Sequence, residues 1–358
     1  MSPEDLFGYI KHGYPAVSGA FPGHDFSGMS FDDALIVDTD FSDCRFVGCS
    51  FERASFARCK FDRAVFGGKP VTKATFGESS MTGARFDGAE VTSVTFAQCD
   101  LTSAVFTDTM MEAVVFAQGS LAKADFARLA GHRLGFIETS LDRTSFADAK
   151  LTISVFGSTD FTTADLTGTR FETVVMMEAN LAHRDFSKGS FKQCTFMKAD
   201  LNGIKLTGAD LSSVIIMEST MTDADLTDTL ASMAIFVGSD LSRTRFDGST
   251  LNSSNFMDAN LAGASLSGCN LDMAYMERAQ APAANFDRAS LAYAQLNHAD
   301  LSGSRFLNAR FADTSLHMAK TEGAMTTGAS GKTLPTDQPR AIAELYDPRK
   351  MALYGEQR

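Results

Sequence analysis

Large apolar residues recur at every fifth position along most of this chain. Within residues 40–66, phenylalanine stands at positions 41, 46, 51, 56, 61 and 66. The same register runs from Phe21 to Leu316, and 57 of its 60 positions hold Phe, Leu, Met, Ile or Val. A period of five fits neither a helical stripe nor the alternation of a strand. It predicts a chain that bends once per pentad, so that four bends close a coil of about twenty residues. The three exceptions to the register are Gly131, Ala231 and Ala281.

A second inward position lies two residues before each large apolar residue, and small side chains dominate there. All six cysteines occupy this position, so we expect buried, reduced thiols that act as small apolar residues. A disulfide framework or a metal cluster is the alternative interpretation. Free buried thiols are typical of a reducing compartment. The cysteines are Cys44, Cys49, Cys59, Cys99, Cys194 and Cys269.

Several pentads read Ala-Asp-Leu or Ala-Asn-Leu, including residues 164–166, 209–211 and 259–261. The chain therefore resembles the pentapeptide-repeat family, whose motif is A(D/N)LXX. The resemblance covers roughly residues 19–320 and implies an all-β fold, a right-handed quadrilateral β-helix, with about 15 coils of repeat. It also implies that the central residue and the residue two before it point inward. The family includes topoisomerase-binding DNA mimics and secreted effectors, so the resemblance implies no single function.

The predicted organisation is a cap at residues 1–20, a solenoid at 21–320, and a tail at 321–358. In the cap, Ser2 is expected to be the N-cap of a short helix that covers the open edge of the first coil. Residues 321–333 are rich in Gly, Thr and Ser and are expected to form a linker. The remaining tail either folds back as a C-terminal cap or docks on a partner. Its apolar residues are Ile342, Leu345, Tyr346, Met351, Leu353 and Tyr354.

The N-terminus lacks the basic and apolar regions of a Sec signal, and no apolar run is long enough to span a bilayer. These features favour a cytoplasmic, bacterial protein without membrane insertion, although export by a specialised system stays open.

No catalytic constellation stands out in the sequence. None of the six histidines is paired with another at a metal-ligand spacing. Asp or Asn directly before the large apolar residue is explained by the repeat, because a short polar side chain can bond the turn backbone. We therefore expect no enzyme activity, no cofactor and no metal.

The formal net charge is −12, which raises the possibility of a DNA mimic that inhibits or protects a type II topoisomerase such as gyrase. However, acidic residues form no continuous strip on any side, and basic residues cluster near one end. The DNA mimic is therefore the alternative hypothesis, and a secretion-system adaptor or secreted effector is the second. Direct nucleic-acid binding is not expected.

One side of the predicted coil carries apolar residues at outward positions. Strand propensity accounts for its Val and Ile better than for its Met residues. We therefore predict a rigid protein-interaction scaffold or adaptor whose partner is another protein or a second copy of the chain. Glu138, Glu178, Lys198 and Glu218 would form the rim. The predicted interface residues are Val115, Val155, Val175, Met177, Met197, Ile215, Met217, Ile235, Val237 and Met257.

Overall fold

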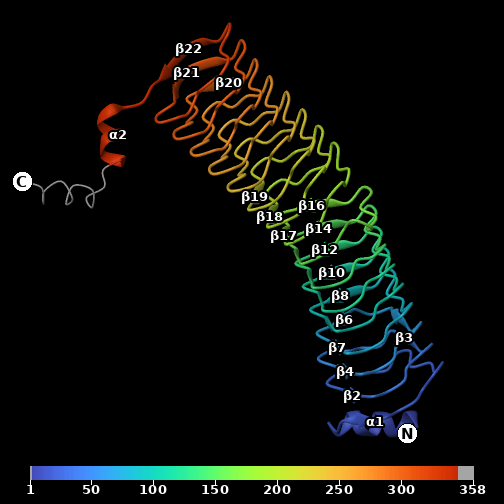
Figure 1. The fold of residues 1–358 in the computed structure, drawn as a ribbon. Helices are drawn as coiled ribbons and strands as arrows, with labels where there is room; N and C mark the ends of the chain where they lie inside the picture. Colours follow the sequence, from blue (N-terminus) through green and yellow to red (C-terminus); the bar gives the residue numbers. More distant parts are fainter. Residues whose placement is uncertain (1, 346–358) are drawn as a thin grey trace, which may run out of the picture. The chain divides into compact units, whose positions relative to one another are not determined.

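The computed structural model describes residues 2–345 and forms a β-solenoid of about 16 turns. It divides into two compact units, Met1–Ile204 and Lys205–Arg358. In both, a residue pairs with the residue twenty positions further along, one coil away (Figure 1). This confirms the four-sided coil that the five-residue period predicts. Neither described helix has the length and hydrophobicity needed to cross a membrane.

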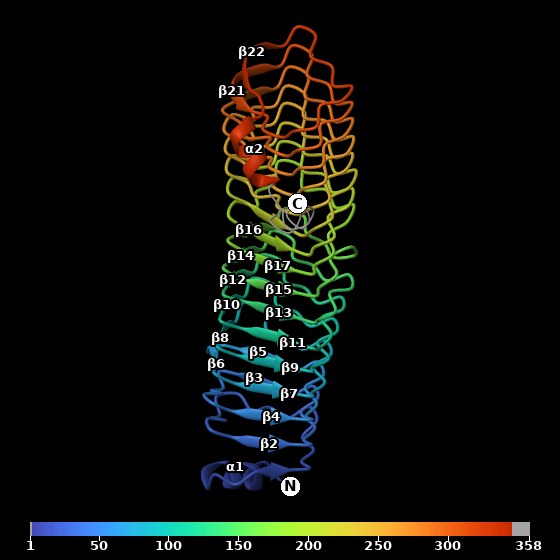
Figure 2. The ribbon, with the colours of Figure 1, turned by 60° about the vertical axis from the view of Figure 1, so that its left-hand side comes forward.

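Unit 1 carries two parallel sheets on different sides of the coil (Figure 2). In the first sheet each strand pairs in register with strands of the adjacent coils, as in Phe96↔Phe116↔Phe136. A separate pair, β3 (Arg45–Val47) and β5 (Val65–Gly67), lies on a third side. The first sheet contains, in order, β1 (Ala16–Val17), β2 (Leu35–Val37), β4 (Ser55–Ala57), β7 (Thr75–Gly77), β9 (Thr95–Ala97), β11 (Val115–Ala117), β13 (Gly135–Ile137), β15 (Val155–Gly157), β17 (Val175–Met177) and β18 (Thr195–Met197). The second contains β6 (Val71–Thr72), β8 (Glu90–Thr92), β10 (Met110–Glu112), β12 (Ala130–His132), β14 (Lys150–Thr152) and β16 (Arg170–Glu172).

The core of unit 1 is a set of stacked phenylalanine rings. The rings of Phe66 and Phe86 lie 4.4 Å apart and nearly parallel, and those of Phe136 and Phe156 lie 4.6 Å apart. Rings within one coil meet edge to face, the other arrangement that aromatic quadrupoles favour. The large apolar register therefore becomes a continuous buried column.

The corners of the coil depend on a backbone turn that follows each inward residue. The second residue after it has a positive φ in almost every pentad, for example 61° at Asp43. The polar residue before it supports the turn, since the backbone N–H of Ser42 donates to Oδ1 of Asp40 at 2.9 Å. This is the local hydrogen bond expected from the Asp and Asn positions of the repeat.

Gly131 leaves an inward position without a side chain, and its neighbours fill the space. A Cβ on Gly131 would lie 2.6 Å from Cδ1 of Leu134 and 3.0 Å from Cδ2 of Leu151. Leu134 occupies a position that elsewhere holds a small residue. Volume is therefore conserved by exchanging the large and small positions.

Helix α1 (Pro3–Lys11) begins where the sequence predicts it. Ser2 and Asp5 form a capping box, with the Ser2 N–H donating to Asp5 and the Asp5 N–H donating to Ser2 Oγ. Leu6 is fully buried, and the ring of Phe7 lies 5.4 Å from that of Phe31. The helix thus contacts the rings at the N-terminal end of the solenoid.

In unit 2 most coils are joined by isolated parallel bridges, such as Leu230↔Thr250 and Asn270↔Ser290. The strands assigned there are β19 (Ile215–Met217), β20 (Ser290–Ala292), β21 (Arg310–Ser315) and β22 (Ser330–Leu334), of which the last three form one sheet.

The linker predicted at residues 321–333 is instead part of a further coil. Met325 pairs with Arg305, and the N–H of Leu316 donates to the carbonyl of Leu334. The sequence prediction was wrong here because the inward positions of this last coil hold Thr321, Thr326 and Gly331, which do not continue the apolar register. Helix α2 (Gln338–Glu344) follows this coil.

Candidate interaction surface

The first sheet of unit 1 presents a surface without charged side chains. Each strand places one inward residue in the core and turns its flanking residues outward. We call this surface the uncharged face. Its residues are Val17, Leu35, Val37, Ser55, Ala57, Thr75, Gly77, Thr95, Ala97, Val115, Ala117, Gly135, Ile137, Val155, Gly157, Val175, Met177, Thr195 and Met197.

The second sheet of unit 1 has the same geometry and a different surface. Its outward residues include Glu90, Glu112, Lys150, Arg170 and Glu172. Strands of this solenoid therefore accept charged residues at outward positions, and strand formation alone does not explain their absence from the first sheet.

Five of the predicted interface residues lie on the uncharged face. Val115, Val155 and Val175 are half-buried, whereas Met177 and Met197 are 41% and 38% exposed. The two methionines are register partners on adjacent strands. The sequence prediction began this surface at Val115 and missed its extension to β1. The outward residues of the earlier strands are mostly Ser, Thr, Ala and Gly, which are not strongly apolar. The usable signal was the lack of charge at these outward positions.

The other five predicted residues lie in unit 2. Ile215 pairs with Ile235 through a parallel bridge. All five are half-buried on outward positions: Ile215, Met217, Ile235, Val237 and Met257. Their role in an interface remains a prediction.

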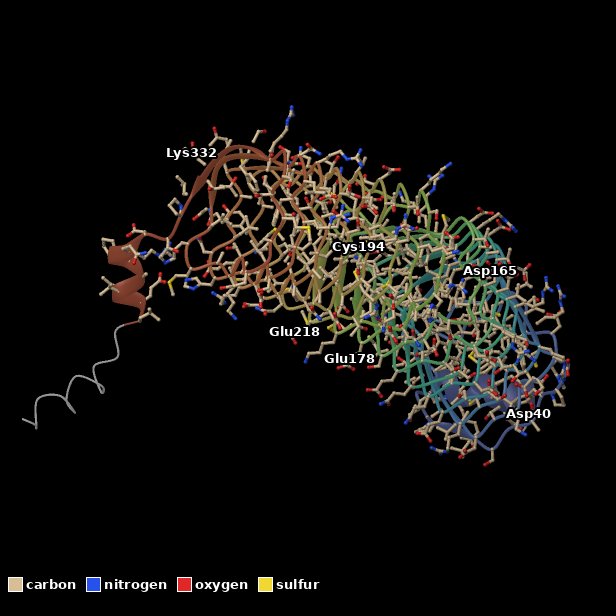
Figure 3. All side chains as sticks on the ribbon, turned by 45° about the horizontal axis from the view of Figure 1, so that its top comes forward. Asp40, Asp165, Glu178, Cys194, Glu218 and Lys332 are labelled. Carbon is tan, nitrogen blue, oxygen red and sulfur yellow. The ribbon has the colours of Figure 1, made fainter. Side chains whose placement is uncertain are left out.

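Directly after each strand of the uncharged face, the chain turns a corner. The corner positions hold mostly polar and charged residues. Glu138 accepts a hydrogen bond from Nε2 of Gln118 at 3.0 Å, and Glu178 accepts one from Oγ of Ser158 at 2.8 Å. Figure 3 places Glu178 and Asp165 on different sides of unit 1. The predicted rim positions Glu138 and Glu178 therefore border the uncharged face and are tied to neighbouring coils.

Two family models match the chain. The model described as "Pentapeptide repeat region" matches residues 49–126. The model described as "Pentapeptide repeats (8 copies)" matches residues 175–212, 219–258, 259–292 and 289–320. The chain belongs to the pentapeptide-repeat family. Both the family resemblance and the solenoid fold expected from the sequence are thus confirmed.

Solved structures of other pentapeptide-repeat proteins show similarity to this chain. HetL, involved in heterocyst differentiation regulation in the cyanobacterium Nostoc sp. strain PCC 7120, is 24% identical, with a TM-score of 0.41 over 56% of this chain and 86% of HetL. A protein from the Arabidopsis thaliana thylakoid lumen is 26% identical, with a TM-score of 0.27 over 31% of this chain and 78% of its own. Full-length QnrB1, a plasmid-mediated fluoroquinolone resistance protein, is 16% identical, with a TM-score of 0.18 over 60% of this chain and 98% of its own. No curated protein sequence matches the chain.

Acidic residues of this pentapeptide-repeat chain are partly neutralised by arginines one coil away. At Arg58, Nε and Nη2 donate to the two oxygens of Asp38 at 2.8 and 3.0 Å. Each such pair joins positive-φ corner residues twenty positions apart, and the arginine holds the carboxyl pKa below its ordinary value. This pairing reduces the free negative charge that a DNA mimic would need. The pairs are Asp33–Arg53, Asp38–Arg58, Asp43–Arg63 and Asp108–Arg128 in unit 1, and Asp223–Arg243 and Asp258–Arg278 in unit 2.

All six cysteines are buried and unbridged within the described chain, as predicted from their position. The thiol of Cys44 lies 2.8 Å from the carbonyl oxygen of Phe21, and that of Cys269 lies 2.9 Å from the carbonyl oxygen of Phe246. Burial raises the pKa of Cys44 to about 11 and that of Cys269 to about 12. The thiols are therefore poor nucleophiles and poor thiolate ligands at neutral pH.

In unit 2 the structure brings together two histidines and a carboxylate that the sequence did not connect. Nε2 of His298 and Nε2 of His317 each lie 3.1 Å from Oε2 of Glu344. The histidines stand nineteen residues apart, nearly one coil, so a metal-ligand spacing of three or four residues does not detect them. His, His and Glu could together hold a divalent cation such as zinc.

The hydrogen bonds around His317 favour attachment of α2 over metal binding. The backbone N–H of Asp337 donates to Nδ1 of His317 at 3.1 Å, which leaves the ring proton on Nε2, facing Glu344. Metal ligation at Nε2 would instead require an unprotonated nitrogen there. Oε1 of Glu344 accepts from Nε of Arg340 at 2.6 Å. The cluster therefore fixes α2 to the last coils.

The tail residues predicted to dock on a partner are not the ones that attach α2 to the solenoid. Ala341 is the buried residue of α2, whereas Ile342 and Leu345 are both 70% exposed. Docking of Ile342 and Leu345 on a partner remains a prediction. The other candidates lie outside the described residues: Tyr346, Met351, Leu353 and Tyr354.

Proposed function

We propose that this pentapeptide-repeat chain is a non-catalytic protein-interaction scaffold whose contact surface is the uncharged face of unit 1. The observation that carries the proposal is the contrast between the two sheets. Nineteen outward positions of the first sheet hold no charged residue, while four of the six strands in the second hold at least one. Depletion of charge is a compositional mark of the central part of a protein interface.

The structural rigidity of the face supports this role. Its strands are joined by parallel ladders, and the inward residues beneath it are fully buried, as at Phe116 and Phe156. A rigid surface loses little conformational entropy on binding. Met177 and Met197 add adaptable side chains that fit partners of varied shape.

A second copy of the chain is the partner that fits this surface best. With a net charge of −12, two copies repel each other over most of their surface. The uncharged face is the part of unit 1 where two sheets meet without opposing charges, and flat sheets pack face to face at about 10 Å.

The test is sedimentation of three proteins: wild type, the double variant Met177→Glu/Met197→Glu, and the control Met110→Glu. Met110 is 57% exposed and lies on the charged second sheet. We expect a dimer for wild type and for the control, and a monomer for the double variant. A double variant that keeps the dimer mass would contradict the proposal.

The DNA-mimic hypothesis stays the alternative and is tested by a gyrase supercoiling assay. Inhibition at low concentration that survives Met177→Glu/Met197→Glu would favour it. A secretion-system adaptor or exported effector would be recognised by its location in the cell.

A further inference from the structure

On one side of unit 1, two adjacent coils lack the backbone hydrogen bonds that join the preceding coils. The N–H of Phe146 donates to the carbonyl of Asp165 at 2.7 Å. One coil further on, Leu166 and Gly168 stand at the positions that should donate to residues 182–190. Within the described chain, neither donates a backbone hydrogen bond to that segment. The coil is therefore open on this side, just before β16 in the chain.

The opening coincides with an arginine at a position reserved for small residues. From Ala74 to Thr314, Arg184 is the one charged residue that stands two before an inward apolar residue. Its guanidinium turns away from the core and donates to the carbonyl oxygens of Thr162 at 3.2 Å and Ala164 at 2.6 Å. Arg184 thus occupies the place of the missing inter-coil contacts.

The same coil stays attached on its other sides. Val175 pairs in register with Thr195 on the uncharged face, and the rings of Phe171 and Phe191 stack at 5.5 Å. The separation is therefore local. It leaves Phe186, which stands in the large apolar register, only half-buried.

The opening forms a cleft of about 710 Å³, within the size range of ligand sites. Leu166 and Phe186 provide apolar lining, and Arg170, Arg184 and Lys188 provide positive charge. Among the described residues, Arg170 and Lys188 form no ion pair. Two carboxylates, Asp148 and Asp185, also line the cleft, so its net charge is positive.

We propose that this cleft binds an extended acidic segment of a partner protein by addition of a β-strand. Leu166 and Gly168 hold the same positions in the coil as Phe146 and Asp148, whose N–H groups donate to the next coil, so a strand lying parallel to them can accept the hydrogen bonds that the next coil does not. Strand addition supplies affinity through the main chain and specificity through side chains. Acidic side chains of the segment would pair with Arg170 and Lys188.

The first experiment measures binding of a fluorescein-labelled octapeptide of alternating valine and glutamate by fluorescence anisotropy. Arg170→Ala/Lys188→Ala should weaken binding at least tenfold, and Lys123→Ala/Arg128→Ala, which removes two cations elsewhere on unit 1, should not. The same peptide with ester links in place of its amides, whose carbonyl oxygens are weaker hydrogen-bond acceptors, should bind at least tenfold more weakly. Met177→Glu/Met197→Glu should bind as wild type, which separates this site from the uncharged face.

The second experiment uses Arg184→Ala, which replaces the arginine with the residue most common at its position. We expect the coil to close, the unfolding midpoint in urea to rise, and peptide binding to be lost although Arg170 and Lys188 are present. Absence of binding to wild type at 1 mM peptide, equal binding by the ester-linked peptide, or binding retained by Arg184→Ala would each overturn the proposal. Competition by inorganic phosphate at a comparable concentration would also overturn it, because it would indicate a site for small anions.

Discussion

Phe116 illustrates at the residue scale how one inward side chain stabilises the solenoid. Its ring is 1% exposed and stacks on Phe96 and Phe136, each at 5.1 Å. Phe116→Ala should lower the free energy of unfolding by about 3–5 kcal/mol, because the rigid neighbours cannot fill the cavity. Chemical denaturation measures this loss, and Val115→Ala is the control on the outward position. An equal loss in both variants would contradict the inward assignment.

The buried thiols predict how stability depends on alkaline pH. Burial raises the pKa of Cys99 and Cys194 from 9.0 to about 11 in the folded protein. The unfolded chain therefore loses the thiol proton first, and stability that is complete below pH 9 is lost as the pH rises toward 11. Each thiol should cost roughly 1.4 kcal/mol per pH unit in that window.

The measurement is urea denaturation of wild type and Cys99→Ala/Cys194→Ala at pH 8 and pH 10. Alanine takes the same position in other pentads, as at Ala54 and Ala64, so the variant should fold. It should lose less stability than wild type between the two pH values. An identical loss would show that the thiols are not protected in the folded state.

At the element scale, coils are joined at their corners by Asp–Arg pairs. In Asp43–Arg63 both arginine contacts measure 2.7 Å, and the arginine lowers the pKa of the Asp43 carboxyl. A lowered folded pKa means that this stabilisation is present above the unfolded value of 3.8 and is lost as the pH falls below it. These exposed pairs are also screened by salt.

Replacing the arginines of three adjacent pairs tests this contribution. Arg53→Gln/Arg58→Gln/Arg63→Gln should unfold at a higher pH than wild type when acid is added, and its stability should depend less on salt. Thermal melts between pH 3 and pH 7 at low and high salt measure both effects. Coinciding acid transitions in the two proteins would mean that the pairs contribute nothing.

The elements also show why the sequence predicted some regions and not others. A repeat of five with inward Phe and Leu specifies coils wherever the register is apolar, and Ser2 with Asp5 specifies the start of α1. The coil at residues 321–334 was missed because it is held by backbone pairing while Thr321 and Gly331 stand at its inward positions. Arg184 was missed because a charged residue at one small position does not by itself indicate that the coil opens there.

At the scale of the whole molecule, the proposed interaction surface lies on unit 1. The sequence located Met177 and Met197 correctly as outward neighbours. The prediction did not extend the surface through Ser, Thr, Ala and Gly to Val17, because it followed apolar residues and these positions are marked only by their lack of charge. The contrast with the second sheet required the structure.

Pulsed electron paramagnetic resonance tests the central claim, that the uncharged face is a protein-interaction surface, most directly. The native thiols are buried, so a nitroxide on Met197→Cys labels one outward site, and Met110→Cys labels the charged sheet as a control. We predict a distinct distance between the labels of two copies for Met197→Cys. For Met110→Cys, we predict a longer distance or none. A distinct short distance for Met110→Cys with no dipolar signal for Met197→Cys would contradict the account.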